Sequence, residues 1–157
     1  MIQRIQTLYL LIPIICLVVV QAGGDIFYLI GENMYALNAY GIVDNMPTAD
    51  VKLVKSFPLF LVIVLLIVLT IVTIFSYKKL KNQLKLVKLI IIIYGLSLLG
   101  LMLLFFLNIN LLDREAEFTY QFGSAMYFII FGFPALFLAI QGIKKDLNLL
   151  DSLNRLR

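Results

Sequence analysis

The chain has 157 residues, of which 62% are hydrophobic and 14% are charged. Soluble domains contain roughly 45 to 50% apolar residues, so a water-soluble fold could not bury this much apolar surface, and the length fits one domain. The formal net charge is +4, but the basic residues lie in short segments between apolar runs. This distribution is typical of membrane topology signals and argues against nucleic-acid binding.

The composition also bears on chemistry, since histidine is absent and Cys16 is the only cysteine. The chain therefore lacks the commonest metal ligand and general base, and it cannot form an intramolecular disulfide. The acidic residues are scattered, and their densest group is DREAE at 113–117, a short connection. Because catalysis needs a nucleophile beside a base, paired carboxylates or metal ligands at compatible spacing, we expect no enzyme activity, cofactor or metal site.

The first apolar run, 5–21, follows Arg4, and the sequence VQA at 20–22 stands at its end. This pattern is typical of a secretory signal peptide, with Ala22 as the last residue removed. The alternative is a retained signal-anchor helix. We expect the retained helix, which makes this run the first of four transmembrane segments.

The segment 22–56 is the only sizeable one outside the apolar runs. Within it, IFYLI and MYALNAY are rich in aromatic and β-branched residues and are separated by the turn sequence GEN. We predict a small extracytoplasmic β-hairpin over the outer ends of the helices. The alternative is that IFYLI continues the first helix. Its tyrosines and apolar residues suit either a partner surface or a cover for the helix ends.

Three further apolar runs, 57–77, 86–107 and 121–141, are separated by a basic inner loop at 78–85 and an outer loop at 108–120. At 1.5 Å per residue, a run of about 20 residues is roughly 30 Å long and crosses the hydrocarbon core of a bilayer. Short connections make successive helices neighbours, so we predict an all-α integral membrane protein with a four-helix transmembrane bundle.

Small residues form two patches in these runs, Ala135 with Ala139, and Gly95 with Ser97 and Gly100. Helices can approach closely at such patches. We expect them to serve packing inside the bundle rather than a dimer face.

The basic residues set the orientation. The amino end, the segment 78–88 and the tail 142–157 together hold 10 of the 13 basic residues with only Asp146 and Asp151 as acids, and the remaining segments hold seven acids. Because lysine and arginine are retained in the cytoplasm, we expect both termini inside and the segments 22–56 and 108–120 outside.

The tail 142–157, GIKKDLNLLDSLNRLR, is amphipathic when drawn as a helix. Its apolar side holds Ile143, Leu147, Leu149, Leu150, Leu153 and Leu156. Such a helix either lies on the inner leaflet as an extension of the fourth span or docks on a protein. We take the following as candidate contacts with a partner or anionic lipid: Lys78, Lys79, Lys81, Lys144, Lys145, Leu147, Leu150, Leu153, Arg155 and Arg157.

The two ends of the chain carry a family resemblance. The opening MIQRIQTLYLL and the closing GIKKDLNLLDSLNRLR resemble the terminal signatures of domain-of-unknown-function family 4293, bacterial membrane proteins with four spans. The family pattern is more charged where this chain has LNLLDSLN. The resemblance implies a bacterial cytoplasmic (inner) membrane location and this architecture, and it implies no activity.

From these observations we expect a non-catalytic integral membrane protein that acts as an accessory or scaffold subunit of a larger bacterial envelope complex. Its expected partners are membrane lipids and other membrane protein subunits. The alternative is a small channel, carrier or lipid-binding protein whose site lies between the helices, near Asn108, Asn110 and Gln121.

Overall fold

The computed structural model describes residues 3–30, 34–44, 53–56, 59–112 and 119–155, and within these ranges the fold is mostly helical. The helices are α1 (Gln3–Gln21), α2 (Leu59–Phe75), the 3-10 helix η1 (Ser76–Lys78), α3 (Leu80–Leu112) and α4 (Ser124–Arg155). The strands are β1 (Phe27–Ile30), β2 (Met34–Asn38), β3 (Gly41–Asp44), β4 (Leu53–Ser56) and β5 (Thr119–Phe122).

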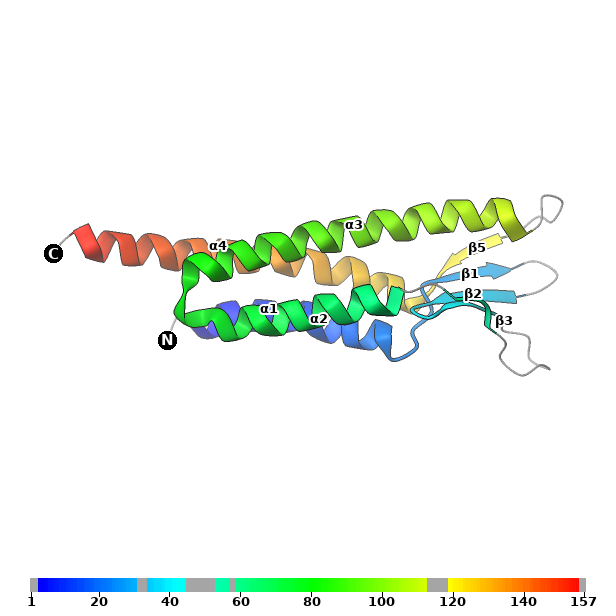
Figure 1. The fold of residues 1–157 in the computed structure, drawn as a ribbon, viewed down its shortest axis with the longest axis horizontal. Coiled ribbons are helices and arrows are strands. Elements are labelled where there is room, and N and C mark those ends of the chain that lie inside the picture. Colours follow the sequence, from blue (N-terminus) through cyan, green and yellow to red (C-terminus); the bar gives the residue numbers. More distant parts are fainter. Residues whose placement is uncertain (1–2, 31–33, 45–52, 57–58, 113–118, 156–157) are drawn as a thin grey trace.

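The four α-helices run side by side along one long axis, with the sheet at one end and both chain termini at the other (Figure 1). Helix α1 packs against α4 and α2, and α3 also packs against α2 and α4. Each helix therefore has two helical neighbours. The connection from α2 to α3 is short, because η1 and Lys79 alone separate them.

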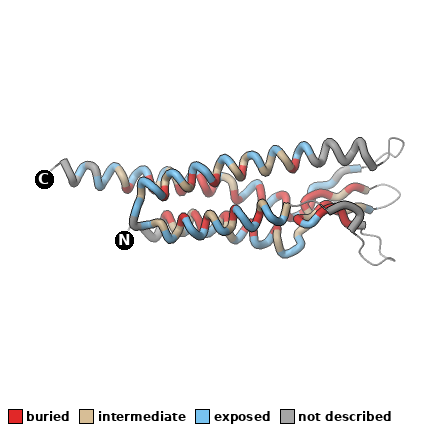
Figure 2. The backbone as a smooth tube through the Cα atoms, viewed as in Figure 1, coloured by how far each residue is buried: buried red, intermediate tan, exposed pale blue. Residues whose placement is uncertain are grey.

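Buried and exposed residues alternate along each helix within the described residues (Figure 2). On α4 the buried stripe includes Ala125, Ile129, Leu136 and Ile143, at spacings that keep them on one face. The exposed surfaces of the helices carry many large apolar side chains, among them Leu8, Ile15, Leu61, Leu99 and Phe131. Large parts of both the interior and the surface of the helical part are thus apolar.

Glycines let α4 approach its neighbours closely. A Cβ atom on Gly132 would lie 3.3 Å from the Cβ of Cys16 and 2.8 Å from the hydroxyl of Tyr94, and one on Gly142 would lie 3.2 Å from the Cγ of Gln6. The predicted patch of Ala135 and Ala139 is also buried within the chain. By contrast, a Cβ on Gly95 or Gly100 would meet nothing within 4 Å, so no close approach occurs at that second patch.

The predicted hairpin is confirmed. Strands β1 and β2 pair antiparallel, with Phe27 opposite Leu37 and Ile30 opposite Met34. The alternative, in which IFYLI continues the first helix, is wrong, because α1 ends at Gln21 and Gly23 follows with a φ of +108° that a helix cannot continue. The expected GEN turn, 31–33, lies outside the described residues.

The predicted all-α fold with a small hairpin is confirmed in part: the described residues are mostly helical, but the hairpin belongs to a five-stranded antiparallel sheet of order β4-β3-β2-β1-β5. Strands β3 and β4 extend it on one side. On the other side β5, from the predicted outer loop 108–120 and the residues after it, pairs with β1 so that Phe27 lies opposite Phe122. Pairing between segments so far apart leaves no local signal in the sequence.

The helix bounds also differ from the predicted segments. Helix α3 begins at Leu80, inside the predicted basic loop 78–85, and continues to Leu112. Helix α4 begins at Ser124, because the first residues of the predicted span 121–141 belong to β5, and it continues unbroken into the predicted tail as far as Arg155. The span and the tail are therefore one continuous helix in the structure.

The sheet joins the helices where two connections cross. The backbone N–H of Gly123 donates to the carbonyl of Ile26 at 2.9 Å, and that of Ala125 donates to the carbonyl of Asp25 at 3.1 Å. A Cβ on Gly123 would lie 1.9 Å from the backbone carbonyl oxygen of Asp25, and one on Gly24 would lie 2.8 Å from the Cβ of Ala125. Only glycine permits the backbones to approach this closely at position 123.

We predict that Gly123→Ala lowers stability by about 1–3 kcal/mol or more, because the added methyl group forces two backbone segments apart. The control is Gly95→Ala, since its methyl group enters open space within a helix and should be neutral or stabilising. Thermal unfolding in mild detergent measures both variants. Equal midpoints for Gly123→Ala and the unmodified chain would contradict the crossing described above.

Candidate functional site

The predicted contact residues gather at the end of the fold that holds the termini. The turn between α2 and α3 and the second half of α4 both lie there (Figure 1). Lys79, Lys81, Lys144 and Lys145 are exposed at this end. We call this region the basic end. The side chains of Lys78, Leu153 and Arg155, and the whole of Arg157, lie outside the described part of the structure.

The apolar side of the tail divides into two parts. Ile143 is fully buried, and Leu147 is half-buried and packs against the main hydrophobic core. One turn further on, Leu149 and Leu150 are 44% and 48% exposed. The first part of the tail therefore covers the helical core, while Leu149 and Leu150 are exposed. The end of α4 projects past the other helices (Figure 1).

A buried polar pair ties the two ends of the chain together. The Nε2 of Gln6 on α1 donates a hydrogen bond to the Oδ2 of Asp146 on α4. Gln6 is 3% exposed and Asp146 is 8% exposed. Burying a carboxylate is costly unless it is hydrogen-bonded. Asp146 therefore depends on Gln6, which stays within hydrogen-bonding distance only while α1 packs closely on α4. The opening and closing segments that carry the family resemblance meet here.

Further polar atoms are buried at the same end. The Oδ1 of Asp146 and the Oε1 of Gln83, near the start of α3, find no hydrogen-bond partner among the described atoms. Gln83 is fully buried, at 2% exposure. The basic end therefore has a polar interior beneath its exposed lysines.

Charge counting in the sequence treated Asp146 as a tail acid and missed its burial. A signal was nevertheless present. Ala125, Ile129, Gly132, Leu136, Ala139, Ile143 and Asp146 follow one another at alternating intervals of four and three. This spacing keeps all seven on one helix face, so the position of Asp146 implies burial although its charge does not.

At the opposite end, polar side chains secure the sheet. The hydroxyl of Tyr40 lies 3.2 Å from the Nε2 of Gln21, at the end of α1, and donates to the Gln21 carbonyl at 3.3 Å. The Tyr28 hydroxyl donates to the Oδ2 of Asp25 at 2.8 Å. This hydrogen bond, with some burial, raises the pKa of Tyr28 above its ordinary value. These contacts hold the first hairpin against the crossing of Asp25 and Gly123.

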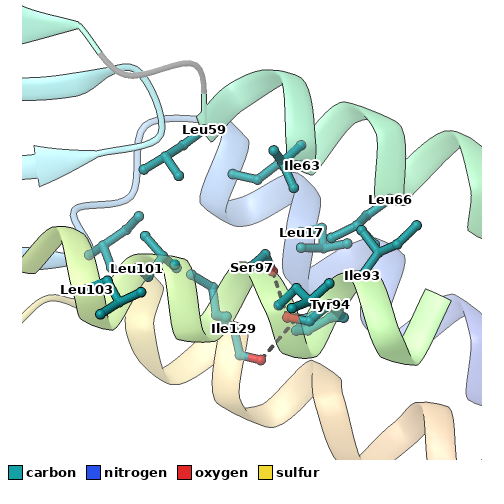
Figure 3. A pocket seen from close by; sticks show the side chains of 14 residues that line it. Leu17, Leu59, Ile63, Leu66, Ile93, Tyr94, Ser97, Leu101, Leu103 and Ile129 are labelled. Carbon is teal, nitrogen blue, oxygen red and sulfur yellow. Dashed lines mark hydrogen bonds between the residues drawn. The ribbon is translucent and has the colours of Figure 1, made fainter. Parts of the chain in front are cut away.

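A cavity of about 500 Å³ lies between α2 and α3 in the half of the helical part nearest the sheet (Figure 3). Leu17 of α1 and Ile129 of α4 complete its wall. The side chains of Asn108 and Asn110, expected near a site between the helices, lie outside the described part. Gln121 is exposed on β5 and does not line the cavity.

Within the described ranges, no three histidine, cysteine, aspartate or glutamate side chains are grouped so as to hold a metal ion. The basic end offers exposed cations, two exposed leucines and a buried polar anchor.

Two of the helices pass the length and composition test for a membrane span. Two described helical stretches, Leu80–Leu103 and Ser124–Leu150, are long and apolar enough to cross a membrane by length and composition, and Gln6–Gln21 and Leu59–Phe75 are shorter apolar helices. This is compatible with a membrane protein that carries a small antiparallel sheet.

The model of the family described as Domain of unknown function (DUF4293) matches residues 2–156, so the chain belongs to that family, as its terminal segments suggested. The comparison with curated proteins gives no match.

We predict that Asp146→Ala costs about 1–3 kcal/mol of stability, because it leaves the Gln6 amide buried without its acceptor. Asp146→Asn keeps a carbonyl acceptor and should cost less. The control is Lys145→Ala, an exposed neighbour that should have little effect. Thermal unfolding in mild detergent gives the values.

A double-mutant cycle with Gln6→Ala sharpens this prediction. Since the two side chains act as one unit, the combined loss should be smaller than the sum of the single losses. Strict additivity, or an Asp146→Ala variant as stable as Lys145→Ala, would contradict the pairing.

Proposed function

We propose that the chain is a non-catalytic integral membrane protein of the bacterial cytoplasmic membrane that acts as an accessory or scaffold subunit of a larger envelope complex. In this proposal the four helices form a transmembrane bundle with both termini in the cytoplasm. The observations that carry the proposal are the projecting end of α4 (Figure 1) and the exposure of Leu149 and Leu150 near the end of that helix.

The exposed apolar surface supports the membrane setting. In the most apolar 18-residue stretch of each long helix, only 22% is buried within the chain for α3 and 39% for α4. A core helix of a soluble protein would be mostly buried, because exposing apolar area to water costs about 25 cal/mol per Å². With 19 and 17 residues, α1 and α2 fall in the range of about 17–25 residues that spans a bilayer. Lipid would cover all four outer faces.

The distribution of charge supports the orientation. The basic end holds the exposed lysines of the turn between α2 and α3 and of α4, and the sheet lies at the other end (Figure 1). By the positive-inside rule the basic end faces the cytoplasm. The sheet would then cover the outer ends of the helices.

The direction of α4 favours docking of the tail over a surface position. The helix continues roughly along the axis of the other helices, past their ends (Figure 1). If those helices cross the bilayer, the tail points away from the membrane and does not lie along the inner leaflet. Leu149 and Leu150 then stand outside the lipid, and a partner protein would bury them.

The alternative of a channel or carrier receives less support. An ion or polar solute needs polar groups near the bilayer midplane, and the wall of the described cavity is almost entirely apolar. Among the alternatives, this cavity favours lipid.

We predict that the double variant Leu149→Lys, Leu150→Lys inserts normally but loses its partner, because both side chains are exposed and contribute little to folding. The control is Asn148→Lys, Ser152→Lys, which adds the same charge at neighbouring exposed positions. Crosslinking in native membranes, followed by purification in mild detergent, measures stoichiometric partners. If the unmodified chain migrates alone, the scaffold proposal is contradicted. If the double variant is misinserted or degraded, Leu149 and Leu150 serve to anchor the chain in the membrane instead.

A topology measurement tests the orientation separately. In a Cys16→Ala background, we expect Met34→Cys to react with a membrane-impermeant maleimide on intact spheroplasts, and Lys145→Cys to react only after the membrane is opened. Both positions are exposed. The reverse pattern would contradict the proposed orientation, and equal reaction of both positions in intact spheroplasts would contradict membrane insertion.

A further inference from the structure

We propose that the cavity between α2 and α3 binds one acyl chain of a phospholipid from the outer leaflet. This inference rests on the membrane setting proposed above. It adds a defined site and a defined class of ligand, and it does not depend on the tail or on any partner protein.

The position of the cavity relates it to one leaflet. Leu59, the first residue of α2, and Ile26, which leads into β1, lie at one end of the wall, and Leu66, near the middle of α2, lies further from the sheet. The cavity therefore occupies the half of the helical part nearest the sheet. With the sheet outside, this half corresponds to the outer leaflet.

The chemistry of the wall favours an apolar ligand. The two hydroxyls nearby are already committed, since that of Tyr94 donates to the Ile129 carbonyl at 3.0 Å and that of Ser97 donates to the Tyr94 carbonyl at 2.7 Å (Figure 3). The wall is otherwise aliphatic, and its volume of about 500 Å³ lies within the range of roughly 300–1,000 Å³ typical of ligand pockets. Apolar cavities stay dry and take up apolar molecules, so the fitting occupant is a hydrocarbon chain.

The wall also reaches the outer surface of α3. Leu96 and Leu103 line the cavity, yet they are 62% and 63% exposed. Between them Gly100 lines the cavity, and a Cβ there would meet nothing within 4 Å. Because these residues lie on the face that the bilayer would cover, an acyl chain can enter sideways from the lipid. Acyl chains are the surrounding solvent there, which favours lipid over a segment of another protein.

Two glycines of α3 provide a matched pair for the test. Gly95 and Gly100 lie on the same helix, and a Cβ on either would have open space. Of the two, only Gly100 lines the cavity. Gly100→Leu should fill the cavity, while Gly95→Leu makes the same chemical change elsewhere. Val62→Phe narrows the cavity from the α2 side and serves as a second, independent variant.

The experiment uses the full chain in vesicles of phosphatidylethanolamine and phosphatidylglycerol. A small fraction of the lipid carries a photoactivatable diazirine in one acyl chain, and mass spectrometry of peptides locates the adducts. We expect adducts on the buried wall residues Ile63 and Leu101 as well as on the exposed Phe131. Gly100→Leu and Val62→Phe should lose the wall adducts and keep those on Phe131, and Gly95→Leu should keep both.

The outcomes separate this inference from the membrane proposal. Adducts on Phe131 with none on Ile63 or Leu101 overturn the acyl-chain site and leave the membrane setting intact. Wall adducts that persist in both cavity-filling variants also overturn it. Adducts at none of these residues overturn the membrane setting and this inference together.

Discussion

The antiparallel contact of α1 with α4 is the constraint on which the rest of the structure depends. It is fixed at both ends, by Gln6 and Asp146 at the basic end and by Gly24 against Ala125 beside the sheet. The chain leaves α1 into β1 and enters α4 from β5. These connections are hydrogen-bonded to each other at Gly123, and β1 and β5 continue side by side from there as an antiparallel pair. The remaining strands then extend the sheet from β1 on its other side.

The same constraint positions the other two helices. Tyr94 ties α3 to α4 through its hydrogen bond to the Ile129 carbonyl, and its ring packs against that of Phe133. Helix α2 packs against α1 and α3. On the sheet side of Tyr94, the walls of α2 and α3 leave the cavity between them. The glycines of α4 lie in close contact with neighbouring helices, whereas those of α3 have open space beside them. The fold is therefore tightly packed around α4 and has space for a ligand beside α3.

The sequence predicted those features that local pattern determines. Apolar runs indicated the helices, the aromatic and β-branched stretches at IFYLI and MYALNAY indicated the first hairpin, and the terminal segments indicated the family. The pairing of β5 with β1 was not predictable, because the partners lie far apart in the chain and TYQF is short. The burial of Asp146 was missed because its charge outweighed its place in the α4 stripe. The tail was predicted as an amphipathic helix, with an extension of the fourth span as one alternative, and α4 does continue into it.

Helix ends that meet in the folded chain should be linkable, and this offers the most direct measurement. The test combines Gln6→Cys with Gly142→Cys in a Cys16→Ala background. A Cβ on Gly142 would lie 3.2 Å from the Cγ of Gln6, so the two introduced cysteines are close enough to form a disulfide. Mild oxidation in native membranes should convert the chain to an internally crosslinked form that migrates differently on a denaturing gel. Gln6→Cys with Gly95→Cys should not crosslink. Failure of the first pair to crosslink, or equal crosslinking of the second, would contradict the pairing of α1 with α4.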